Sequence, residues 1–336
     1  MEQTPDPIAS APEPKAPHAP ADAGAPIFIV GCERSGTTLL RAMLNAHPVL
    51  FIPRESHFIE KLIEYRGACD PRQPLTPAQT RTCHELIVGH RRWKDWECDP
   101  DALWEALSAL EQPTLASVIA TAYRQPAAAV GATRWGDKTP SYVALVPEIA
   151  ELFPDALFVH IIRDGRDVCV SFLKTQWLGP WVTKIAERWL QRVSAGRRAA
   201  QALPGERYLE VRYEDLVAEP GQALRRICAF VGITFEDEML EYHRRGDTLV
   251  AASERQLHQK LNRPPQPRDV QRFRNELPAH RTWLFEACAH TLLRDAGYSI
   301  SCYRLKRVTV YPALLLVSAL LTRTARLRRT LGLTRR

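Results

Sequence analysis

The feature that most constrains the fold is a short apolar run followed at once by a glycine-containing loop. Residues 27–30 are Ile-Phe-Ile-Val, a run typical of a strand buried on both faces. Gly31 to Thr38 follows with the spacing G-x4-G and two threonines, and residues 37–44 have the composition of a helix. Backbone N–H groups in such a loop bind phosphate-like anions. We therefore predict that ordered structure begins near Pro26 with a strand, a phosphate-binding loop and a helix.

Two more strand–helix pairs are predicted further along the chain. Residues 156–162 form an apolar run before a helix over 167–176, and residues 208–212 precede a helix over 220–231. Strands that alternate with helices favour an α/β fold with a parallel, doubly wound sheet between two helical layers. Residues 58–131 are predicted to be mostly helical and to form a cap over the sheet.

Composition places the chain among globular proteins and argues against a nucleic-acid-binding domain. Of 336 residues, 45% are hydrophobic and 25% charged, which is enough for one large α/β domain. Nine Lys/Arg and no acid lie in residues 304–336, so the net charge of +7 becomes −2 for the remainder. The eight cysteines form no C-x-x-C pair, which favours a reducing, cytoplasmic location over a disulfide framework.

The two ends of the chain differ in character from the middle. Residues 1–25 are rich in Pro and Ala, and we predict a disordered leader without a signal peptide. Residues 308–322 are uncharged and mainly apolar, but as a helix they would span only about 22 Å, less than the ~30 Å hydrocarbon core. The tail over 308–336 either contacts a membrane surface peripherally or packs on the domain as a terminal helix.

The loop differs from the loops of ATP- and GTP-hydrolysing enzymes at one position. Thr37 stands where those enzymes carry the lysine that reaches the β- and γ-phosphates. The strand that ends at Arg163 also lacks an acid that would help to hold magnesium. Because Arg34 supplies a positive charge inside the loop, we predict a site for an anion that needs no metal ion.

The sequence Arg34-Ser35-Gly36-Thr37-Thr38 after a strand, extended through residues 39–48, resembles the 5′-phosphosulfate loop of the sulfotransferase family. The extension is most similar to the bacterial and tyrosylprotein branch. The resemblance implies a P-loop-like fold over residues 26–303, with 3′-phosphoadenylyl sulfate as donor and adenosine 3′,5′-bisphosphate as product. It also implies that Arg34, Ser35, Gly36, Thr37 and Thr38 bind this nucleotide.

Three other segments match the family. Arg163, with Ser171 eight residues later, resembles the pair that binds the 3′-phosphate, and a strand-end arginine can donate a fork of hydrogen bonds there. Lys138 lies in Trp-Gly-Asp-Lys-Thr-Pro, a segment that by resemblance contacts the bridging oxygen and the 5′-phosphate.

Tyr213 begins a Tyr-Glu-Asp segment that by resemblance implies a place near the adenine, although a core tyrosine is the alternative. Arg263 is our preferred residue of a closing loop over the 3′-phosphate, with Lys260 as the competitor.

Glu55 is the predicted general base, because it lies where the tyrosylprotein branch carries its glutamate. We expect burial to raise its pKa toward the working range. His57 competes for this role, and on a strand the two side chains would share a face. With Lys138 and Arg34 holding the sulfuryl group, these residues predict in-line transfer to a hydroxyl of a glycan, lipid or small metabolite. A P-loop kinase or NTPase, or an inactive membrane-associated nucleotide-binding protein, remains the alternative.

Overall fold

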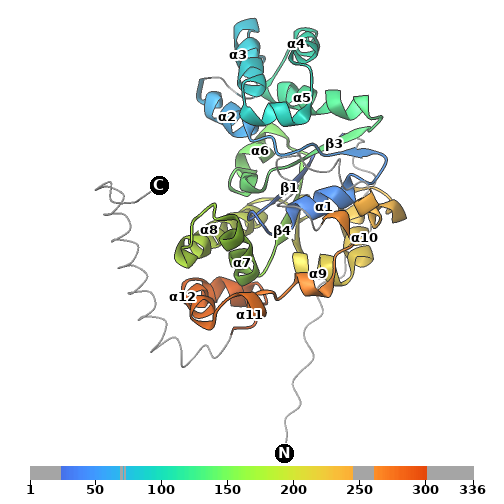
Figure 1. The fold of residues 1–336 in the computed structure, drawn as a ribbon. Helices are drawn as coiled ribbons and strands as arrows, with labels where there is room; N and C mark the ends of the chain where they lie inside the picture. The colour runs from blue at the N-terminus through green and yellow to red at the C-terminus, as the bar shows by residue number, and fades with distance from the viewer. Residues whose placement is uncertain (1–23, 69–70, 72, 245–260, 301–336) are drawn as a thin grey trace, which may run out of the picture.

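A parallel five-stranded sheet lies at the centre of the protein. The computed structural model describes residues 24–68, 71, 73–244 and 261–300. Within them the strand order is β2-β3-β1-β4-β5, and every neighbouring pair is parallel (Figure 1). The predicted α/β class is therefore confirmed. The strands are β1 (Ile27–Gly31), β2 (Leu50–Phe51), β3 (Arg134–Lys138), β4 (Leu157–Ile162) and β5 (Tyr208–Arg212).

Helices cover both faces of the sheet. One face carries α1, α9 and α10, and the other carries α6, α7 and α8, with α12 packed outside α7 and α8 (Figure 1). Helices α2 to α5 stack beyond the end of the sheet formed by β2 and β3. The helices are α1 (Thr37–Leu44), α2 (Phe58–Tyr65), α3 (Pro77–Val88), α4 (Pro100–Ser108), α5 (Leu115–Ala129), α6 (Val146–Leu152), α7 (Gly165–Thr175), α8 (Val182–Ala202), α9 (Tyr213–Ala218), α10 (Pro220–Val231), α11 (Phe273–Glu276) and α12 (Ala279–Asp295).

Strand β1 is central because its side chains are apolar on both faces. Ile27 and Ile29 pack into the core formed with α1, α9 and α10, whereas Phe28 and Val30 pack into the core formed with α5 and α6. All four side chains are fully buried. The alternation follows from the two-residue period of a strand, so one short run supports two hydrophobic cores. The burial predicted for residues 27–30 is confirmed.

Strand β3 was not predicted, because its sequence, Arg-Trp-Gly-Asp-Lys, has no apolar strand pattern. All five residues are nevertheless buried, and the strand pairs with β1 on one side and β2 on the other. Gly136 permits the close approach to β1, since a Cβ there would lie 2.6 Å from the carbonyl oxygen of Ile27. The strand is thus stabilised by its position between two neighbours and not by apolar side chains alone.

Aromatic side chains connect the helical region to the sheet. Helices α2 to α5 lie within the predicted helical region, residues 58–131. The Tyr123 ring on α5 stacks on Trp135 of β3 with centroids 4.6 Å apart, and Trp96 meets Tyr123 edge-on at 4.9 Å. Phe58 on α2 continues the contact at 5.3 Å from Trp96. Large rings in such contacts bury much apolar surface, so the cap and β3 share one core.

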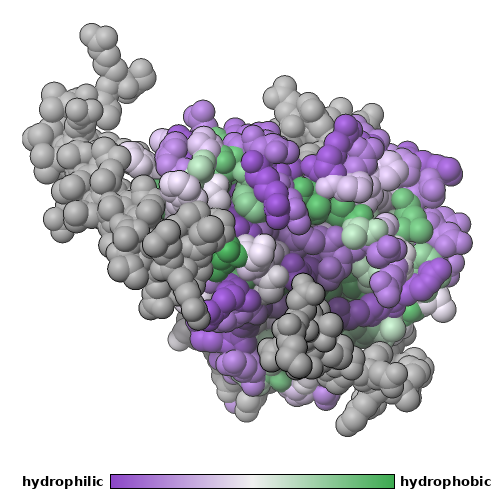
Figure 2. Space-filling view, turned by 90° about the horizontal axis from the view of Figure 1, so that it is seen from below, coloured by the Kyte–Doolittle hydropathy of each residue, from purple (hydrophilic) through white to green (hydrophobic). Residues whose placement is uncertain are grey.

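Several predictions concern residues outside the described ranges. They are the leader through residue 23, Lys260 and the tail over 304–336. No helix among the described residues combines the length and hydropathy needed to span a bilayer. The face seen from below is mostly hydrophilic, and hydrophobic residues appear on it as separate patches (Figure 2).

Candidate active site

The predicted site residues gather at the carboxyl ends of four neighbouring strands. Strand β1 ends at Gly31 and enters the phosphate loop, and β3 ends at Lys138. Arg163 follows β4 directly, and Tyr213 follows β5. Strands β2 and β3 lie on one side of β1, and the later strands β4 and β5 lie on the other side. Ligands of open α/β sheets bind at such a reversal of strand order, which is where these residues meet.

The loop from Gly31 to Gly36 has a backbone that suits anion binding. Gly36 precedes α1 with a φ of 98°, and a Cβ on it would lie 2.3 Å from the Tyr213 ring. Only glycine fits there. Arg34 also has a left-handed backbone, with a φ of 72°. No side chain caps the N-terminus of α1, so its first N–H groups are oriented toward the loop.

Two buried donors at the loop fit a phosphorylated nucleotide. Ser35 Oγ is fully buried, and the described part of the chain offers it no hydrogen-bond partner. Nε of Arg163, a residue that is 5% exposed, is likewise unpartnered among the described residues. Buried polar groups normally have partners, so orphaned donors beside a phosphate-binding loop indicate a ligand that supplies acceptors. Phosphate oxygens are such acceptors.

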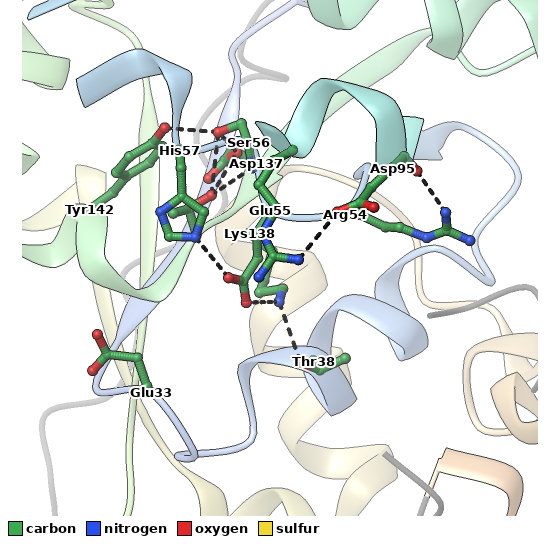
Figure 3. Close-up of polar contacts among 12 residues, drawn as sticks. Glu33, Thr38, Arg54, Glu55, Ser56, His57, Asp95, Asp137, Lys138 and Tyr142 are labelled. Carbon is green, nitrogen blue, oxygen red and sulfur yellow. Dashed lines mark hydrogen bonds and ion pairs between the residues drawn. The ribbon is translucent and has the colours of Figure 1, made fainter. Parts of the chain in front are cut away.

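At one side of the loop, Lys138 lies between an acid and a hydroxyl. Its Nζ is 2.6 Å from Glu55 Oε1 and 3.3 Å from Thr38 Oγ1 in the first turn of α1 (Figure 3). The second oxygen of Glu55 is 2.9 Å from His57 Nε2. The side chain of Lys138 is 5% exposed, whereas those of Glu55 and His57 are 26% and 29% exposed. The structure thus brings these four predicted residues together.

The pKa of Glu55 differs from the prediction. Burial does act to raise it, but the charge of Lys138 and hydrogen bonds from His57 and Lys138 outweigh burial and hold the pKa well below its usual value. The expected upward shift is therefore wrong for this state of the protein. Glu55 and His57 also do not lie on a strand: the segment before α2 is irregular, and His57 has a φ of 56°.

At the other side of the loop, arginines and a serine form a second group. Arg163 donates to Asp167 Oδ2 at 3.2 Å and to the carbonyl oxygen of Asp269 at 2.8 Å. Its Nη1 also reaches the carbonyl oxygen of Arg34 at 3.3 Å. Nε of Arg34 donates to Ser171 Oγ at 3.0 Å. Arg34, predicted beside the sulfuryl group, thus contacts the serine predicted to bind the 3′-phosphate.

Tyr213 and Arg263 lie next to this second group. The Tyr213 ring is buried against Gly36, and the guanidinium of Arg163 lies 4.2 Å from its centroid. This arrangement gives Tyr213 a packing role at the loop. Arg263 forms two hydrogen bonds of 2.9 Å with the carboxylate of Asp269. Because the backbone carbonyl of Asp269 accepts a hydrogen bond from Arg163, the segment that carries Arg263 is attached to Arg163.

Several residues of the site were missed in the sequence. Asp167 and Asp269 support Arg163, and Ser56 and Asp137 lie directly behind Glu55 and Lys138 (Figure 3). Ser56 stands between Glu55 and His57, and Asp137 belongs to the Trp-Gly-Asp-Lys-Thr-Pro segment, so sequence position alone was a usable signal for both. Asp269 carried none. Among the described residues, no group of three His, Cys, Asp or Glu side chains is placed to hold a metal ion.

The parallel sheet, the glycine loop before α1 and the cations at the strand ends define a P-loop-like α/β nucleotide-binding protein. A family model narrows this class. The model described as "Sulfotransferase family" matches residues 26–237, and the chain belongs to that family.

Similar proteins from other organisms agree with this assignment. A protein-tyrosine sulfotransferase of Drosophila melanogaster is 26% identical over 223 residues, covering 64% of this chain and 40% of that protein. Nodulation protein NoeE of Sinorhizobium fredii is 28% identical over 303 residues, covering 82% and 66%. The chain therefore spans less than two thirds of the length of these relatives.

Solved structures show the same fold. The sulfotransferase domain of the curacin biosynthetic pathway has a TM-score of 0.59 at 20% identity, and the match covers 83% of this chain and 99% of that domain. The sulfotransferase domain of the Synechococcus PCC 7002 olefin synthase has a TM-score of 0.56 at 23% identity, covering 84% and 99%.

Proposed function

We propose that this protein transfers a sulfuryl group from 3′-phosphoadenylyl sulfate to an acceptor hydroxyl and releases adenosine 3′,5′-bisphosphate. The acceptor is a glycan, a lipid or a small metabolite, and the reaction needs no metal ion. Membership of the sulfotransferase family supports the reaction class. One relative is a protein-tyrosine sulfotransferase, so a protein acceptor is an outcome that the experiment below has to distinguish.

The observation that carries this proposal is the group formed by Lys138, Glu55 and Thr38. Lys138 contacts both the first turn of α1 and the carboxylate of Glu55. In this position its ammonium group can stabilise a phosphate oxygen as the bond to that oxygen breaks, while the neighbouring carboxylate takes the proton of a hydroxyl. The loop itself has Thr37 in place of the phosphate-binding lysine of NTPases, which disfavours the kinase or NTPase alternative. The orphaned donors Ser35 Oγ and Arg163 Nε favour a ligand with phosphates at both ends.

In the proposed reaction, Glu55 takes the proton of the acceptor hydroxyl as the acceptor oxygen forms its bond to sulfur. The bond between sulfur and the bridging oxygen of the 5′-phosphate breaks, and its electron pair stays on that oxygen. Lys138 stabilises the charge that develops there, and such preorganised charge acts mainly in the transition state. Lys138 therefore breaks its ion pair with Glu55 and binds the donor instead. The Glu55 carboxylate is then available as a base.

Arg163, Ser171 and Arg34 bind the 3′-phosphate end in this proposal. The contact between Arg34 and Ser171 favours this place for Arg34 over one beside the sulfur atom. Arg263 closes the site from the segment that Asp269 attaches to Arg163. Tyr213 supports the loop beneath the nucleotide. Cytoplasmic location and peripheral membrane contact through residues 308–336 remain predictions from the sequence.

His57 is the competing base, because its 2.9 Å contact with Glu55 also resembles a histidine oriented by a carboxylate. The variants Glu55→Gln and His57→Asn separate the two roles. Loss of a general base lowers turnover by about 10²–10⁴-fold. We expect Glu55→Gln to show this loss and His57→Asn to lose much less; the reverse order would assign the base to His57.

The experiment that tests the function uses the purified full chain and 3′-phosphoadenylyl sulfate that carries ³⁵S. Cell extract separated into lipid, glycan and protein fractions serves as the source of acceptors. We expect label in a lipid, glycan or small-molecule product, with and without a metal chelator. Lys138→Ala is the matched control that should abolish the transfer.

Three results would overturn the proposal. Binding of adenosine 3′,5′-bisphosphate without labelled product from any fraction would favour an inactive nucleotide-binding protein. Transfer that Lys138→Ala leaves unchanged would exclude the proposed chemistry. Label in the protein fraction alone would exclude the proposed acceptor classes.

A further inference from the structure

The segment that carries Glu55 and His57 has no regular structure of its own. It connects β2 to α2, and residues 52–57 belong to neither element. His57 lies in the left-handed region and does not cap α2 with its side chain. A left-handed backbone costs a non-glycine residue about 1 kcal/mol or more, so local preferences do not maintain this conformation. Contacts from elsewhere must hold the two side chains in place.

Those contacts converge on Ser56, the residue between the two. Its N–H donates to Thr139 Oγ1 at 3.1 Å, and its hydroxyl donates to Asp137 Oδ2 at 2.8 Å. The Tyr142 hydroxyl lies 2.8 Å from Ser56 Oγ and accepts the N–H of Ile59 at 3.0 Å (Figure 3). Both the backbone and the side chain of Ser56 are thus bound to residues at or just after the end of β3, and Ser56 is fully buried.

Asp137 is the common acceptor of this network. Its Oδ2 accepts hydroxyls from Ser56, Tyr123 at 2.7 Å and Thr139 at 3.2 Å. The residue is fully buried, and burial raises the pKa of its carboxyl although the three hydroxyls oppose the shift. Lys138 is its neighbour on β3. Successive side chains of a strand point to opposite faces, so Asp137 faces the cap while Lys138 reaches the loop.

We propose that Asp137 is a positioning residue for sulfuryl transfer: through Ser56 it holds Glu55 at its observed distances of 2.6 Å from Lys138 and 2.9 Å from His57. The inference rests on the proposed function. Strand β3 then positions both groups that act in the reaction. It carries Lys138, and it also carries Asp137, whose carboxylate anchors the segment that contains Glu55. A displacement of about 1 Å at a reacting group costs up to ~10²-fold in rate.

Two variants separate positioning from simple core stability. Ser56→Ala and Tyr123→Phe each remove one buried hydroxyl from the same oxygen of Asp137, at 2.8 Å and 2.7 Å. Only Ser56 belongs to the segment that carries the base, whereas Tyr123 lies on α5. A role in stability alone would affect the two variants equally. Asp137→Asn keeps an acceptor oxygen and tests whether hydrogen bonding suffices.

The measurements are Tm, kcat, the KM for 3′-phosphoadenylyl sulfate, and crystal structures of the full-length variants. We expect both hydroxyl deletions to lower Tm by similar amounts. Ser56→Ala should lower kcat by about 10–100-fold with the donor KM within about threefold, whereas Tyr123→Phe should leave both within about threefold. Asp137→Asn should retain kcat within about fivefold. In the Ser56→Ala crystal the Glu55 carboxylate should leave Lys138.

Equal kcat values for Ser56→Ala and Tyr123→Phe would overturn the proposal. So would a Ser56→Ala structure in which Glu55 stays at its wild-type position beside Lys138. A wild-type protein that transfers no sulfuryl group would refute the proposed function instead. In that case the position of Glu55 in the Ser56→Ala crystal structure, compared with its position in the wild-type protein, still decides whether Ser56 and Asp137 position Glu55.

Discussion

The two sides of the phosphate loop hold their cations in different ways. Arg163 is held by Asp167 and by the carbonyl oxygen of Asp269, and neither contact has to be released in the proposed reaction. Lys138 instead pairs with Glu55, which does have to be released in the proposed reaction. Arginine offers a rigid fork of donors, whereas lysine is a point charge on a flexible stem. We therefore expect Arg163, on the side that binds the nucleotide, to keep its partners, and Lys138, on the side that reacts, to exchange its partner.

The largest effect is expected from Lys138→Ala. Removing one group that stabilises developing charge costs about 10²–10³-fold in kcat. In 3′-phosphoadenylyl sulfate the bridging oxygen does not yet carry this charge, so the Kd of the donor should change by less than about tenfold, which isothermal titration calorimetry without an acceptor can measure. A loss of nucleotide affinity as large as the loss of kcat would contradict the division between the two sides.

Arg163→Gln is expected to have a smaller effect, and this effect falls on nucleotide binding. Hydrogen bonds to charged groups contribute about 1.5–3 kcal/mol, so the Kd of adenosine 3′,5′-bisphosphate should rise by about 10–100-fold. The kcat at saturating donor should change little. Arg66→Gln is the matched control, because it removes an arginine that is paired with Glu151 of α6 and is not one of the proposed site residues. An unchanged Kd for Arg163→Gln would break the comparison.

The smallest effect is a difference between two pH profiles. Lys138 keeps the pKa of Glu55 low in the free enzyme, so a deprotonated base persists as the pH falls. Once the donor engages Lys138, the pKa of Glu55 rises toward the ordinary value of about 4.3, and kcat should fall at higher pH than kcat/KM. We expect kcat at pH 4 to decrease about threefold more than kcat/KM. If both parameters fall together near neutral pH, the His57 imidazole takes the proton.

Local patterns in the sequence were sufficient for the sheet centre and the loop. The apolar run before Gly31 and the helix after Gly36 are contiguous, and the structure confirms both boundaries within one residue. Strand β3 was missed because Arg134, Asp137 and Lys138 make it look like a polar loop. Its burial depends on the neighbouring strands, which periodicity does not reveal.

Sequence segments indicated candidate residues for the site, but not which of these residues contact one another. Glu55 and Lys138 are 83 positions apart, and their 2.6 Å contact depends on how β2, β3 and α2 are arranged. The prediction of a raised pKa for Glu55 considered burial without this partner. Arg34 and Ser171 are 137 positions apart, and their hydrogen bond likewise follows from the tertiary fold.

The alignment of β3 against β1 has a chemical consequence as well as a packing one. Phe28 lies opposite Asp137, and Ile29 lies opposite Lys138. A shift of one residue would exchange the faces of the two side chains. It would place a carboxylate against the phosphate loop and an ammonium group among the aromatic rings of the cap. Insertions and deletions should therefore be tolerated in the turn at Gly131, outside the strand, and should inactivate the protein when they fall between Arg134 and Lys138.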